Sequence, residues 1–153
     1  MGVIAVRKFF EERELDFEII EMEESTATVE LAAQALGVEP ALIAKTMAFR
    51  QKEQAVLVVT QGDARVDNRK YKEQFKEKAK MLKSDEVLEL TGHPVGGVCP
   101  FGLKEPLDIY LDISLKKFEY IYPAAGSKNS AVKITPKQLH DVTGGEWVDV
   151  CKE

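Results

Sequence analysis

The longest uninterrupted apolar run in the chain is Ala55–Val59, and it limits the possible folds more than any other feature. Five residues are far too few for a bilayer-spanning helix, which needs about 20. Together with Thr46–Phe49 across the polar turn Gln51–Gln54, the run predicts a β-hairpin, with its second strand, Ala55–Thr60, buried on both faces. The chain is therefore expected to fold around a sheet and to contain no membrane segment.

Helix signals recur on both sides of this hairpin. Apolar residues at helical spacing predict a helix over Val3–Glu14, and Thr28 is a candidate N-cap for Val29–Leu36, with Gly37 as its stop. The remaining helix signals are Pro40 at a first helical position, Asp67 before the Tyr71 and Phe75 pair, Ser84 before a helix that Gly92 ends, and the capping box Thr135–Gln138.

Short alternating segments predict further strands at Phe17–Ile19, Leu107–Leu111, Glu119–Pro123, Ala131–Ile134 and Trp147–Val150. No repeat, low-complexity tract or linker interrupts the chain. The sequence therefore predicts one α+β domain over residues 1–153, with a mixed sheet of six or seven strands and flanking helices. Its length is sufficient for one hydrophobic core.

The net charge of −5 argues against a protein that wraps long nucleic acid, so DNA is not an expected partner. The charge is unevenly distributed, however. Residues 11–39 hold ten acidic side chains against Arg13 alone, whereas residues 65–83 hold eight basic and three acidic ones. This distribution leaves room for a local contact with a polyanion.

Cysteine and histidine are scarce. Cys99 and Cys151 form no Cys-x-x-Cys pair, and His93 and His140 are the only histidines, so neither a disulfide framework nor a metal site is expected. The chain also lacks the Gly-x-Ser-x-Gly, Walker and Gly-x-Gly-x-x-Gly motifs of common hydrolases, NTPases and dinucleotide-binding proteins. No cofactor is predicted.

Three places carry residue types that packing alone does not require: Lys45, the loop Gly96–Gly102 and the loop Gly126–Asn129. Each also has a structural explanation. Lys45 is compatible with a solvated lysine, and the two loops with a tight turn and a hairpin tip. Adjacent glycines let a ligand approach the backbone and leave N–H groups free to donate. Cys99 lacks an identifiable base, which favours a packed thiol over a nucleophile.

The order of these pieces resembles a known family. The matching segments are Val29–Ala33 with Leu36-Gly37, Lys45-Thr46, Gln61–Asp63, Thr91–Gly102, Asp112 and Ala125–Asn129. They resemble the YbaK/EbsC family, the prolyl-tRNA-synthetase-associated editing domain, from about Thr26 to Val150. The resemblance implies a barrel-like sheet and a cytoplasmic deacylase that removes wrongly attached amino acids from tRNA, most often proline tRNA.

The resemblance also implies the site. Lys45 matches the essential lysine of the family, and the backbone amides of Gly96, Gly97 and Val98 are candidate oxyanion donors. Expected substrate contacts are Thr28, Thr46, Thr91, Cys99, Pro100, Phe101, Asp112, Gly126, Ser127 and Asn129. Within the basic stretch, Arg65, Arg69, Lys72 and Lys76 are expected to contact the tRNA.

Two questions stay open at the level of sequence. The lysine is followed by Thr46 where alanine-editing members typically have asparagine, which argues against alanine specificity and leaves cysteine, serine or another small residue open. The second question is whether the domain hydrolyses the ester or only binds aminoacyl-tRNA or prolyl-tRNA synthetase. Lys45, Gly96 and Pro100 favour an enzyme, and the expected partners are the aminoacyl-tRNA acceptor end and a prolyl-tRNA synthetase.

Overall fold

The computed structural model describes residues 2–153; Met1, the first residue of the sequence, lies outside the described part. The helices are α1 (Val3–Glu12), α2 (Val29–Leu36), α3 (Asn68–Phe75), α4 (Ser84–Thr91), α5 (Pro136–Thr143) and the short 3₁₀ turns η1 (Pro40–Leu42) and η2 (Ile113–Lys117). The strands are β1 (Ile19–Glu21), β2 (Ile43–Gln51), β3 (Gln54–Gln61), β4 (Asp108–Asp112), β5 (Tyr122–Pro123), β6 (Ser130–Val132) and β7 (Glu146–Val148). No helix among residues 2–153 is long and apolar enough to cross a membrane.

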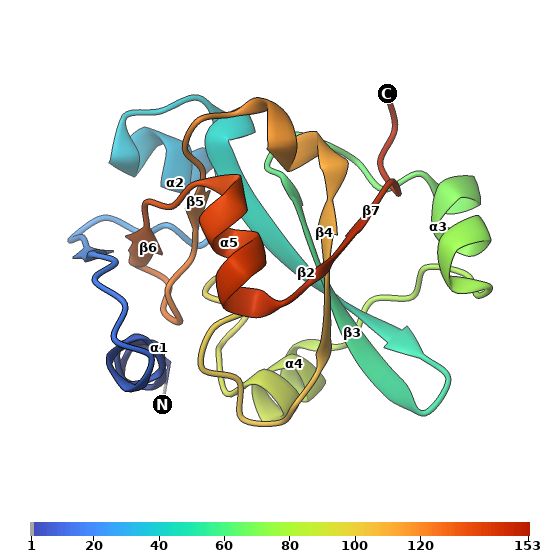
Figure 1. Ribbon diagram of the computed structural model, residues 1–153, viewed down its shortest axis with the longest axis horizontal. Coiled ribbons are helices and arrows are strands. Elements are labelled where there is room, and N and C mark those ends of the chain that lie inside the picture. The colour runs from blue at the N-terminus through green and yellow to red at the C-terminus, as the bar shows by residue number, and fades with distance from the viewer. Residues whose placement is uncertain (1) are drawn as a thin grey trace.

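The strands form a curled mixed sheet with helices around it (Figure 1). Five strands lie in the order β5-β2-β3-β4-β7, in which only the β2–β3 pair is antiparallel. β1 and β6 form a separate antiparallel pair. Bridges from Ile121 to Ile134 and from Ala124 to Ala131 join this pair to the β5 edge, and the surface closes partway like a barrel. The expected α+β fold is confirmed, with its seven strands divided between two sheets.

The β2–β3 hairpin lies at the centre of the sheet, as its apolar run predicts. Residues 55–60 of β3 are all buried, between β2 on one side and β4 on the other. The pairing runs without interruption from Gln51 opposite Gln54 to Ala44 opposite Gln61. The hairpin is therefore the rigid frame from which the neighbouring loops are positioned.

The first strand begins later than its alternating pattern predicts. Pairing with β6 starts at Ile19, opposite Val132, and continues to Glu21. Phe17, expected as the start of the strand, packs its ring 5.4 Å from that of Phe10, centroid to centroid. The apolar residue thus anchors the connection to α1, and the ladder begins only beyond it.

Local capping signals set most of the helix ends. Thr28 Oγ1 accepts a hydrogen bond from Leu31 N–H at 3.1 Å, and the carboxylate of Asp67 accepts from two amides at the start of α3. The predicted capping box at Thr135 is present. Ser84 is not the N-cap expected from the sequence. Lys83 takes that position because its N–H is accepted by the Glu86 carboxylate, which leaves Ser84 as the first helical residue.

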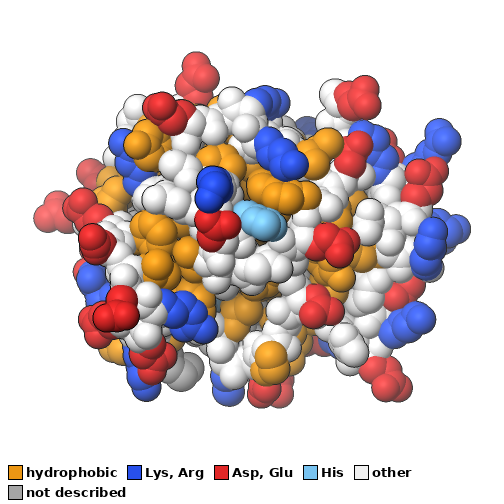
Figure 2. All heavy atoms as spheres, in the orientation of Figure 1, with side chains coloured by type: hydrophobic (Ala, Val, Ile, Leu, Met, Phe, Trp, Pro, Cys, Tyr) orange, Lys and Arg blue, Asp and Glu red, His pale blue; other side chains and the backbone are white. Residues whose placement is uncertain are grey.

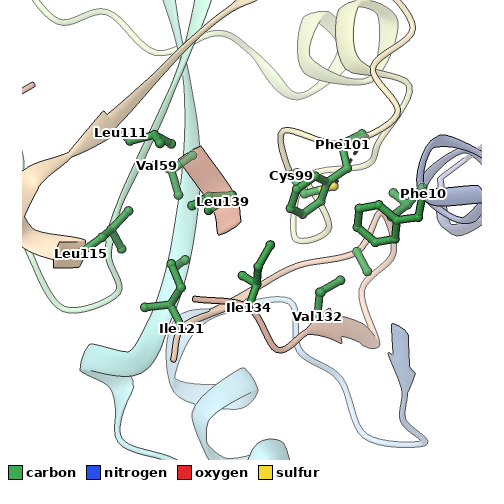
Figure 3. Packing of buried hydrophobic residues seen from close by; sticks show 13 residues of the cluster. Phe10, Val59, Cys99, Phe101, Leu111, Leu115, Ile121, Val132, Ile134 and Leu139 are labelled. Carbon is green, nitrogen blue, oxygen red and sulfur yellow. Dashed lines mark hydrogen bonds between the residues drawn. The ribbon is translucent and has the colours of Figure 1, made fainter. Parts of the chain in front are cut away.

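The two faces of the large sheet are covered differently. The main core cluster joins α1 and α5 to one face, where Phe10, Phe101, Ile121 and Leu139 meet (Figure 3). On the other face α3 packs Tyr71 and Phe75 against β2, β3 and β7. In Figure 1 α3 stands at the opposite side of the molecule from α2, β5 and β6. This separation matters for the distribution of the predicted site residues.

Candidate active site

A cavity of about 260 Å³ opens between α2, β2, the start of α4, the loop around Gly96 and the start of β6. Its wall is formed mainly by small or aliphatic side chains, among them Ala32, Ala48, Leu82 and Val87. Ligand pockets in proteins commonly measure about 300–1,000 Å³, so this cavity suits a small group. Among residues 2–153, Lys45 is the only charged side chain that lines it.

Lys45 is the third residue of β2, just after the helix-to-strand junction at which the sequence places it. Its ammonium donates to the Ala64 carbonyl oxygen at 2.6 Å, which holds the partly buried side chain in place. Burial lowers the pKa of Lys45, and the carboxylates of Asp63 and Glu30 oppose that shift. Cys151 opposes it only as a thiolate, and burial raises the pKa of Cys151 to about 12, so at neutral pH that contribution is absent.

The outer edge of β2 is unpaired where it borders the cavity. Pairing with β5 ends at Ala44, while Leu82 N–H donates to the Ala48 carbonyl further along the same edge. Because alternate residues of a strand direct their backbone groups to the same edge, the N–H and C=O of Thr46 point outward between these two contacts. Within residues 2–153 this edge therefore offers one free donor and one free acceptor beside the cavity.

The two glycine-containing loops lie against each other. Gly126 N–H donates to the Gly97 carbonyl at 3.0 Å, and a Cβ on Gly97 would stand 2.7 Å from the backbone of Ser127. Gly96 has a φ of +94°, and a Cβ there would meet Ala27 at 3.0 Å. Glycine is therefore required at both positions, at one for contact between the loops and at the other for the turn beside the cavity.

The structure brings together only part of the predicted site. Of the residues expected to act on or bind the substrate, those that line the cavity are Thr28, Lys45, Thr46, Gly96 and Val98. Those that do not line it are Gly97, Thr91, Cys99, Pro100, Phe101, Asp112, Gly126, Ser127 and Asn129. Contacts within the protein explain the positions of several members of this second group.

Some of these residues use their polar groups internally. Gly97 N–H donates to the Pro94 carbonyl at 2.9 Å and is not free for a substrate. Thr91 Oγ1 donates within its own helix turn, and the Asp112 carboxylate accepts from Ser114 N–H and Val150 N–H. Their polar groups are thus occupied in holding the fold together.

Cys99 and Phe101 belong to the core, where they lie beside Phe10 (Figure 3). The Cys99 thiol is fully buried, and burial raises its pKa to about 12. A thiol in such surroundings is not converted to the nucleophilic thiolate at neutral pH. The interpretation of Cys99 as a packed thiol fits this environment.

None of the four predicted tRNA contacts lines the cavity. Arg69 and Lys72 line a separate surface hollow on α3 with Lys78, and Lys76 ends that helix in a left-handed conformation. Arg65 precedes α3, and its charge contributes to the lowered pKa of Lys45 after the larger effect of burial. Acidic and basic side chains both occur around the face of the molecule in Figure 2, without separating by sign.

Sequence reasoning missed several cavity residues, including Thr26, Ser84, Tyr122 and Ser130. Ser130 follows the predicted loop Gly126–Asn129 directly, and its hydroxyl lies 2.6 Å from that of Ser127. Thr26 precedes the predicted N-cap Thr28 by two positions. The sequence offered one indication of Thr26 and Ser130, namely that both lie close to predicted site residues. Which residue of each loop faces the cavity depends on the folded backbone.

Known proteins resemble this chain over most of its length. Residues 23–142 match the model of the aminoacyl-tRNA editing domain. The "Uncharacterized protein YwhH" of Bacillus subtilis (strain 168) is 46% identical over 155 residues, covering 100% of this chain and 99% of that protein. The "Putative Cys-tRNA(Pro)/Cys-tRNA(Cys) deacylase EbsC" of Enterococcus faecalis is 26% identical over 129 residues, covering 83% of this chain and 79% of that protein.

A solved structure agrees with these relatives. The "Crystal structure of a putative trans-editing enzyme for prolyl tRNA synthetase" superimposes with a TM-score of 0.91 at 32% identity, covering 99% of this chain and 97% of that one. The sequence matches and the structural match therefore indicate the same family. The chain belongs to the aminoacyl-tRNA editing domain family.

Proposed function

We propose that this protein hydrolyses the ester bond of a mischarged aminoacyl-tRNA, acting in trans on proline tRNA that carries a small amino acid. The observation that carries the proposal is the small cavity with Lys45 as the only charged lining residue in the described part of the chain, in a member of the editing family. The prolyl-tRNA link is supported by the solved trans-editing relative.

The chemistry requires little from side chains. An aminoacyl ester is already activated, so hydrolysis needs a positioned water molecule and donors for the developing oxyanion. The N–H groups of Gly96, Val98 and Thr46 are the backbone candidates, because Gly97 N–H is already bonded to Pro94. The terminal ribose hydroxyl of the tRNA assists the attack on the ester in this scheme.

Lys45 supplies the positive charge. Its ammonium donates one hydrogen bond to the Ala64 carbonyl, which leaves two of its three donors for a phosphate or the ester carbonyl. Arg65, Arg69, Lys72 and Lys76 would guide the acceptor end of the tRNA from outside the cavity. Arg69 and Lys72 lie on α3 and Lys76 ends it, outside the cavity, which fits contact with the tRNA body. Arg65 adjoins Ala64, the partner of Lys45, and is closer to the site.

The decisive experiment measures release of labelled amino acid from proline tRNA charged with alanine, serine or cysteine. Lys45→Ala is expected to slow hydrolysis about tenfold or more, within the range of one electrostatic contact in an active site. Lys8→Ala changes an exposed lysine on α1 and is the matched control. Circular dichroism should show the same fold for both variants.

The same experiment separates an enzyme from a binding module. Folded wild-type protein that binds charged tRNA but releases none of the three amino acids would favour the binding module. Full activity of Lys45→Ala would remove this lysine from the mechanism.

A further inference from the structure

Two threonine hydroxyls in the cavity wall have unused hydrogen-bonding capacity. Among the described residues, four buried side-chain atoms lack a partner, and two of them are Thr26 Oγ1 and Thr46 Oγ1. Both threonines line the cavity. Since buried polar groups are normally satisfied, two orphaned hydroxyls in one wall indicate a ligand that supplies the missing partners.

Backbone contacts fix the two threonines on different elements of the cavity wall. Thr26 N–H donates to the Lys128 carbonyl at 2.6 Å, which ties the segment before α2 to the second glycine loop. Thr46 lies within β2, opposite Val59 of β3. The two hydroxyls are therefore held on separate elements of one cavity, and each is able to donate one hydrogen bond and accept two.

The other residues that line the cavity disfavour some chemical groups as ligands. Among the described residues no carboxylate lines the cavity, so a cationic side chain would find no counter-ion there. Thr28, a third threonine of the wall, already accepts a hydrogen bond from Leu31 N–H through its hydroxyl oxygen, which caps α2. Because Lys45 is assigned to the phosphate or the ester carbonyl in the proposed function, selection of the amino-acid side chain depends on size and on hydrogen bonds to neutral groups.

We propose that Thr26 and Thr46 recognise a hydroxyl on the side chain of the attached amino acid, so that serine is removed in preference to alanine. This inference rests on the proposed deacylase function. Serine fits because it is small and its hydroxyl both donates and accepts, whereas alanine leaves both threonines unpaired. The thiol of cysteine is a weak donor and acceptor and is expected to rank between them.

The test compares hydrolysis of seryl-, cysteinyl- and alanyl-tRNA by wild-type protein, Thr26→Val and Thr46→Val. Valine keeps the shape of threonine and removes the hydroxyl. Wild-type kcat/KM is expected to favour serine over alanine by about tenfold or more, and each variant should lose most of that ratio through slower serine release. Thr143→Val, outside the cavity, is the matched control.

A binding measurement keeps the inference testable without catalysis. Adenosine carrying a 3′-seryl amide and its alanyl counterpart cannot be hydrolysed as esters. Wild-type protein should bind the seryl compound about tenfold more tightly, and the two cavity variants should bind both compounds alike.

The outcomes distinguish hydroxyl recognition by Thr26 and Thr46 from the proposed deacylase function. Hydrolysis of all three charged tRNAs with no preference for serine, or a preference that survives both valine substitutions, overturns the role of the hydroxyls and leaves the deacylase intact. Selective binding of the seryl compound without any hydrolysis supports the hydroxyl recognition and overturns the proposed function.

Discussion

The two faces of β2 differ in packing: one borders the cavity and the other is packed against α3. On one face Ala44, Thr46 and Ala48 are small and border the cavity. On the other, Phe49 lies 4.9 Å from Tyr71, centroid to centroid, within the dense cluster formed with α3. Because side chains alternate across a strand, one rigid element both anchors the fold and leaves space for a ligand.

At the unpaired edge of β2, residues from both faces of the strand line the cavity. Lys45 and Met47 alternate with the small residues and share the face of Phe49, yet both also line the cavity. They reach it where the strand lacks a neighbour, between the end of the β5 pairing and the Leu82 contact. Lys45 therefore borders the cavity although it alternates along the strand with the small lining residues.

The largest effect is expected on the packed face. Phe49→Ala removes a buried ring, and loss of such a side chain typically costs about 3–5 kcal/mol of unfolding free energy. Chemical denaturation measures the loss. Ile4→Ala, at a side chain that is 71% exposed, is the control and should change stability by about 0.5 kcal/mol or less. A loss of similar size for both variants would show that the buried Phe49 ring contributes no more to the unfolding free energy than an exposed side chain.

On the cavity face, Ala48→Leu should change activity more than stability. The added carbons enter space that is empty in the folded protein, so deacylation should fall about tenfold or more while overpacking strain stays below the usual range of about 1–3 kcal/mol. Turnover and denaturation of the same preparation give both numbers. Strong destabilisation with normal turnover per folded molecule would mean that this face is packed and that the substrate binds elsewhere.

The local signals in the sequence predicted much of this arrangement. Thr28, Asp67 and the Thr135 box act through neighbouring residues, so their helices could be located without knowledge of the fold. The Ala55–Val59 run likewise predicted a buried strand correctly. The prediction of Ser84 as the N-cap was wrong because Lys83 N–H donates to the Glu86 carboxylate and Lys83 takes the N-cap position. A serine at a helix start does not by itself reveal this alternative.

The cavity itself was less predictable. Its wall combines segments from α2, β2, α4 and β6 that are far apart in the sequence. Lys45 and the loop that contains Gly96 stood out by residue type, and the family resemblance supplied their expected roles. Thr26 and the open edge at Thr46 depend on strand register and on the Lys128 contact. Sequence patterns do not encode such long-range geometry.

The smallest effect is expected outside both faces of β2, on α3. Arg69→Glu combined with Lys72→Glu should weaken tRNA binding several-fold and reduce its salt dependence, because two phosphate contacts are lost. Hydrolysis of a minimal aminoacyl-nucleotide should stay unchanged. Lys137→Glu on α5 is an exposed control. Equal losses on both substrates would indicate damage to the cavity, and equal retention would make these side chains ordinary solvated residues.

The gap in the edge of β2 also limits what else the protein can bind. An exposed strand edge readily adds a strand from another chain. Here β5 covers the edge up to Ala44, and the segment around Lys80–Leu82 covers it from Ala48 onward. The opening at Thr46 is shorter than an ordinary strand, which has about five or six residues. A strand of ordinary length therefore does not fit into the gap, which disfavours extension of the sheet by another polypeptide at this edge.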